Sequence, residues 1–80
     1  MKRRKALYSI GDLLVELDDN LNPITGIITD VNLSEYEEQY FYSIKWADLP
    51  IEATISEAIL HWRVENSIWS YYGVILNEKK

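Results

Sequence analysis

The segment from residue 39 to residue 46 constrains the fold more than any other part of the sequence, because its side chains alternate strictly in character. One parity holds only large apolar side chains, at Tyr40, Tyr42, Ile44 and Trp46. The other parity is mixed and holds Phe41, Ser43 and Lys45. A period of two residues is that of a β-strand, whose successive side chains point to opposite faces. We therefore predict a strand over Gln39–Trp46 with one face in the core.

Other segments have the composition of short strands bounded by turns. The further predicted strands are Leu13–Leu17, Thr25–Leu33, Ile51–Ile55 and Ile68–Leu76. The intervening Asp18–Pro23 and Asp48–Pro50 contain the Asx residues and prolines that favour turns. Ser56 is a suitable N-cap, so Ser56–Trp62 is predicted to form one or two helical turns. The alternative that the pattern leaves open is one longer helix over Ile51–Val64, with these side chains inward: Ile55, Ile59, Trp62 and Leu60.

Five short strands at regular spacing predict a mainly all-β fold, a small barrel with a short helical turn before its last strand. The 80 residues suffice for one domain. We expect residues 1–6 to be a flexible basic arm, residues 7–76 the barrel and residues 77–80 a tail.

No apolar run approaches the length of a membrane span. Gly11, Asp12 and Glu16 interrupt the segment that would follow a signal peptide's basic start. We therefore expect a cytoplasmic protein that does not bind membranes.

Charge is distributed very unevenly along the chain. Its net charge is −5, and six of the eight basic residues lie at the two ends. Between Ala6 and Glu78, only Lys45 and Arg63 oppose thirteen acidic residues, so this body carries a net charge of −11. Such a body repels the phosphate backbone of nucleic acids. The expected partners are basic proteins or further copies of the chain, with nucleic acid disfavoured.

The sequence offers little for catalysis or metal binding. It has no cysteine, which excludes disulfides and thiolate zinc sites. The single histidine, His61, has Glu57 one helical turn away, but a metal site usually needs three or four ligands. The acidic clusters, around Asp18 and around Glu37, lie in predicted loops, where carboxylates are ordinarily solvated. We expect a protein that is not an enzyme and that has no metal site and no cofactor.

The last predicted strand is apolar on both of its faces. One parity holds Trp69, Tyr71 and Ile75, and the other holds Ile68, Tyr72, Val74 and Leu76. Adjacent apolar pairs such as Leu13 and Leu14 repeat this character. A strand that is apolar on both faces is usually covered on both faces. In a chain this short the second cover is expected to be another chain, which predicts a homo-oligomer. The residues expected to make the contact are Leu14, Phe41, Ile68, Tyr72 and Val74.

Three segments together resemble the opening strands of SH3-like barrels of the Tudor and KOW type. They are Gly11–Val15, which opens with Gly-Asp, Gly26–Val31, which opens with glycine, and Tyr42–Trp46, which closes with an aromatic residue. Ser56–Trp62 then stands where such barrels have a helical turn. The layout is also similar to small domains of bacteriophages, especially marine ones. The Tudor resemblance implies an aromatic cage for methylated lysine or arginine, and the KOW resemblance implies contact with RNA or the ribosome.

We therefore expect a protein-interaction or assembly module, of viral origin, that self-associates or docks on a larger complex. The alternative is an acidic inhibitor that occupies the basic nucleic-acid-binding site of a host protein. A third hypothesis is a nucleic-acid-binding barrel that uses its basic arm.

Overall fold

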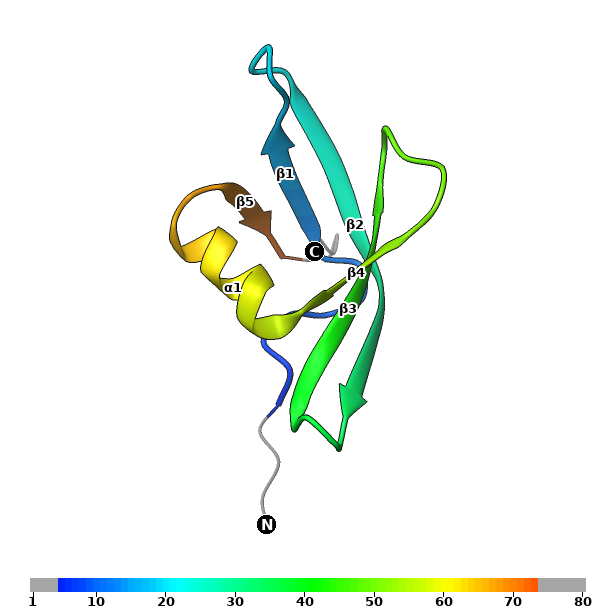
Figure 1. Ribbon diagram of the computed structural model, residues 1–80. Coiled ribbons are helices and arrows are strands. Elements are labelled where there is room, and N and C mark those ends of the chain that lie inside the picture. Colours follow the sequence, from blue (N-terminus) through cyan, green and yellow to red (C-terminus); the bar gives the residue numbers. More distant parts are fainter. Residues whose placement is uncertain (1–4, 74–80) are drawn as a thin grey trace, which may run out of the picture.

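A computed structural model describes residues 5–73 of the chain as five antiparallel strands and one helix (Figure 1). The elements in chain order are β1 (Leu13–Leu17), β2 (Pro23–Ser34), β3 (Gln39–Trp46), β4 (Ala53–Ser56), α1 (Glu57–Glu65) and β5 (Trp69–Tyr72). The prediction of a mainly β fold with a helical turn before the last strand is confirmed.

The strands form a single sheet in the order β4-β3-β2-β1-β5. The first four make a meander, and β5 returns to pair with β1, so that Leu13 faces Tyr72 across that pair. The sheet curls so that its two edge strands, β4 and β5, approach the same side of the molecule, where α1 connects them (Figure 1). We call the gap between β4 and β5 the seam. Helix α1 packs against β3, β4 and β5 and covers part of it.

The core fills the concave side of the curled sheet. Its buried apolar members are Tyr8, Leu14, Ile28, Tyr42, Ile44, Trp46, Leu60 and Trp69. At Gly26 the backbone passes so close to the indole of Trp46 that an added Cβ would lie 2.6 Å from it. A bulge between Ile28 and Asp30 then shifts the register of β2. Beyond it the inward parity changes, and Val31 turns toward the core.

The strands predicted over Leu13–Leu17 and Gln39–Trp46 have the observed bounds, and β2 extends slightly beyond its prediction. The alternative of one helix over Ile51–Val64 is wrong, because Ala53–Ser56 pairs with β3. Ser56 is the N-cap, as predicted, with its side chain accepting from the backbone N–H of Ile59. The helix runs three residues beyond Trp62, to Glu65. Of the predicted last strand, residues 69–72 are observed, and residues 74–76 lie outside the described part.

The boundary of the basic arm needs a correction at Ala6, which packs against the core. The next residues are held by two buried carboxylates. Glu57 accepts a hydrogen bond from the backbone N–H of Leu7 at 3.0 Å, and Asp12 accepts one from that of Ser9 at 2.9 Å. Buried carboxylates need such hydrogen-bond donors. The chain is therefore fixed to the fold from Ala6 onward.

Candidate functional site

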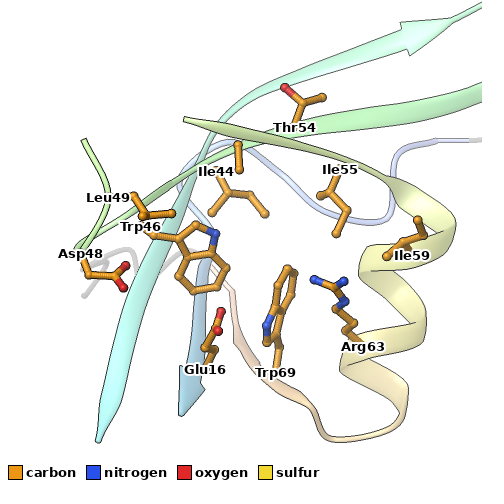
Figure 2. Close-up of a pocket in the computed structure, with 11 residues that line it drawn as sticks. Glu16, Ile44, Trp46, Asp48, Leu49, Thr54, Ile55, Ile59, Arg63 and Trp69 are labelled. Atoms are coloured by element: carbon orange, nitrogen blue, oxygen red, sulfur yellow. The ribbon is translucent and has the colours of Figure 1, made fainter. Parts of the chain in front are cut away.

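The seam contains a pocket of about 350 Å³ between α1 and β4 on one side and β1 and β5 on the other (Figure 2). The residues that line it come from six segments of the chain: Glu16, Ile44, Trp46, Asp48, Leu49, Ala53, Thr54, Ile55, Ile59, Arg63 and Trp69. Concave apolar sites with a few polar groups are the usual form of a binding site. We call this site the seam pocket.

Two indole rings form the wall between the pocket and the core. Trp46 ends β3 and Trp69 begins β5, and their ring centroids are 5.0 Å apart at an interplanar angle of 60°. Both residues are buried. The guanidinium of Arg63 lies 4.9 Å from the centroid of Trp69, a cation–π contact. The indole of Trp69 therefore contacts Trp46 in a T-shaped pair and also contacts the guanidinium of Arg63 on α1.

Two carboxylates, Glu16 and Asp48, give the pocket its charge. Glu16 pairs with Trp69 across β1 and β5, and Asp48 lies in the turn after β3. Figure 2 shows Glu16 at the foot of the two indoles and Asp48 on the β3 side. In the described fold the side chain of Lys45 donates to the carbonyls of Trp46 and Leu49. Arg63 also lines the pocket, where its guanidinium lies over Trp69, so the lining holds two carboxylates and one guanidinium.

The rim of the pocket is apolar and exposed. Leu49 is 44% exposed and Ile59 is 48% exposed, and Ile51 in the same turn is 73% exposed. Beside them runs the outer edge of β4, which within residues 5–73 pairs only with β3. An edge strand presents unpaired N–H and C=O groups to any extended chain that lies beside it. The pocket therefore combines a hydrophobic rim, an acidic interior and a free backbone edge.

Of the five residues predicted to contact a partner, the four within residues 5–73 are not gathered at one place. Leu14 was assigned wrongly, because its side chain has no exposed surface and points into the core. Phe41 is half-buried and pairs with Ser56 at the far end of β3. Ile68 is 49% exposed just before β5, Tyr72 is 51% exposed at its end, and Val74 lies outside the described residues.

Tyr72 belongs to a short apolar row on the convex face of the sheet. It pairs with Leu13 on β1, which in turn pairs with Ile27 on β2. Leu13 is half-buried and Ile27 is 39% exposed. Within β5 only Trp69 is buried, whereas Tyr71 and Tyr72 are 38% and 51% exposed.

The His61–Glu57 pair considered from sequence does not form a site. Glu57 turns into the core, where it accepts a hydrogen bond from the hydroxyl of Tyr42 at 2.7 Å. Burial and this hydrogen bond raise the pKa of Tyr42 well above its ordinary value. His61 is exposed; its Nδ1 lies 2.9 Å from the hydroxyl of Tyr8 and its Nε2 3.5 Å from Glu65. The contact with Tyr8 links the helix to the segment before β1, and the contact with Glu65 lies within the helix.

The predicted acidic cluster around Asp18 also has a structural role in the described fold. Asp18 accepts hydrogen bonds from the backbone N–H groups of Asn20 and Asn22, at 2.9 Å and 2.8 Å, which closes the turn between β1 and β2. Across residues 5–73, no group of three or more histidine, aspartate or glutamate side chains is arranged to hold a metal ion. Nor does any helix in that range have the length and apolar character to cross a membrane.

No family model, curated protein or solved structure matches the chain. The seam pocket was missed by the sequence reasoning because its lining is spread from Glu16 to Trp69. One signal was present, since Trp46 closes the most regular predicted strand. Nothing in a linear pattern brings that residue beside Trp69.

Proposed function

We propose that this protein is a non-enzymatic protein-interaction module that holds an extended segment of a protein partner in its seam. The observation that carries the proposal is the seam pocket, where a buried pair of indoles meets two carboxylates beside the free edge of β4. Extended peptides commonly bind by adding a strand to such an edge, with side-chain pockets giving specificity. The strand order, with β5 returning beside β1, supports the SH3-like comparison, a fold type with many binding roles.

The lining selects the kind of side chain that the partner inserts. A lysine or arginine has an apolar stem that packs on hydrophobic surface while its charged head stays near polar groups. In the seam pocket the stem lies against Trp46 and Ile55, and the head reaches Glu16 and Asp48. The exposed Ile59 covers a neighbouring apolar residue of the same segment. The partner segment therefore carries a lysine or arginine at the position that enters the pocket.

The test is a titration followed by NMR at the indole N–H groups of Trp46 and Trp69. The probe is a short peptide that alternates lysine and leucine, and its control carries glutamate in place of lysine. The proposal expects the lysine peptide to shift both indole signals and the amides of β4, with little effect from the glutamate peptide. D48K is expected to weaken binding, whereas D19K, which makes the same charge change outside the pocket, is not. Shifts absent from the seam with both peptides would reject the proposed function.

A second function, an acidic inhibitor of a nucleic-acid-binding protein, is favoured by one observation. The body between Ala6 and Glu78 carries a net charge of −11, which attracts basic surfaces of any shape. Binding of this kind depends on the sum of the acids and not on one pocket. Retention on immobilised polylysine would then fall equally for E16K/D48K and for the matched D19K/E37K variant. A larger loss for the first variant favours the interaction module.

A further inference from the structure

We infer that the seam pocket binds the basic segment Lys2–Lys5 of a second copy of this chain. The inference rests on the proposed function and names its partner: the module assembles with itself by inserting one copy's basic segment into the next copy's seam.

Charge complementarity is the first argument. The segment has four consecutive basic residues, Lys-Arg-Arg-Lys. The pocket presents Glu16 and Asp48 together with Arg63, whose guanidinium lies over Trp69, so its lining holds two acids and one base. Long cationic side chains are the kind that this lining selects, because their stems pack on apolar surface and their heads pair with carboxylates.

The position of the two surfaces is the second argument. Figure 1 shows the first described residues, which begin at Lys5, leaving the fold at its lower end. The ends of β1 and β3, which carry Glu16 and lead to Asp48, lie at the upper end of the same view. Ala6 and Leu7 are held to the fold, so the segment starts from a fixed point on the side away from the carboxylates. A second copy offers its own segment without this restriction.

This geometry has a consequence for the form of the assembly. Because the donating segment and the accepting pocket are different surfaces, the contact is heterologous, and each copy both donates and accepts. Heterologous contacts generate rings where the rotation closes and open filaments where it does not. The assembly is therefore expected to grow beyond a dimer as protein concentration rises.

The test uses light scattering coupled to size exclusion on the full chain, from micromolar to millimolar concentration. Wild type is expected to associate at about 0.1 M salt and to weaken about ten-fold or more at about 1 M, since the Debye length falls from about 10 Å to about 3 Å. Two variants are each expected to be monomeric: one with all four basic residues of the segment replaced by glutamate, and E16K/D48K. The matched control D19K/E37K is expected to associate like wild type.

The decisive measurement is light scattering on a mixture of the two charge-reversed variants, the segment variant and E16K/D48K. The two charge-reversed variants complement each other, so an equimolar mixture is expected to regain association. A milder E16Q/D48N variant, with near-ultraviolet circular dichroism as the check on packing, keeps the test valid where the lysine variant fails to fold. A monomeric wild type, or association that persists at high salt and in the segment variant, would overturn the inference. Peptide binding at Trp46 and Trp69 would still stand in that case, so the proposed function is judged separately.

Discussion

Replacing Glu57 by alanine is expected to destabilise the protein severely, although sequence alone suggests only a favourable first-turn acid. The carboxylate is 2% exposed, and its Oε2 accepts from the backbone N–H of Leu7 at 3.0 Å and from the Tyr42 hydroxyl at 2.7 Å. Hydrogen bonds to a charged group each contribute about 1.5–3 kcal/mol, and a donor left unpaired in the core costs about 1–3 kcal/mol. The alanine variant no longer buries a charged carboxylate, and this gain offsets part of the loss. The net decrease in the free energy of unfolding is then about 3 kcal/mol. For a domain of this size that lowers Tm by about 12–24 °C.

The assay is thermal and denaturant unfolding of E57A, Y42F and the double variant. Because Glu57 and Tyr42 share a hydrogen bond, their effects are expected to be non-additive by about 0.5–3 kcal/mol. The matched control is E52A, which removes an exposed glutamate near the start of β4 and is expected to change the free energy of unfolding by less than about 0.5 kcal/mol. A value for E57A as small as that of the control would refute the reasoning that this carboxylate anchors the segment before β1.

Three further outcomes are expected. Gly26→Ala should cost about 1–3 kcal/mol, because its Cβ would lie 2.6 Å from Trp46, and should change the near-ultraviolet dichroism of the indole. Burial and a hydrogen bond to a carboxylate raise the pKa of Tyr71 from 10.0 to about 12. The unfolded chain therefore releases this proton first, so stability should be full below pH 10 and fall as pH rises toward 12. That decline should be shallower in Y71F. Deleting residues 1–4 should leave Tm nearly unchanged, whereas deleting residues 1–8 should abolish cooperative unfolding.

Strand positions were predictable from the sequence because they depend on local alternation. Gln39–Trp46 alternates between apolar and mixed side chains, and the observed burial of Tyr42, Ile44 and Trp46 follows that parity. The N-cap at Ser56 was predictable for the same reason, since capping involves only the next helical turn.

Which of two adjacent apolar residues faces the core was not predictable in the same way. Leu13 and Leu14 have identical side chains, and the register with Gly26 and Tyr71 turns the second inward. The burial of Glu57 could not be predicted either, because its hydrogen-bond partners, Leu7 and Tyr42, are distant in sequence. The seam pocket depends on such long-range pairing throughout. The sequence contains these residues, but it does not show that they lie close together in the fold.

The pairing of β5 with β1 sets the order in which the chain folds. Strands β1 to β4 are joined by short turns and form by local hairpin closure, whereas β5 must return across most of the sequence: the hydrogen bond between Tyr71 and Asp12 joins residues 59 positions apart. Closing so long a loop costs conformational entropy that only the completed core repays. During synthesis the first strand therefore emerges long before its second neighbour exists. We expect the nascent chain to hold a meander whose two edges, on β1 and β4, are unpaired; β5 then covers the edge of β1 and brings Trp69 to Trp46, so the seam is expected to form last.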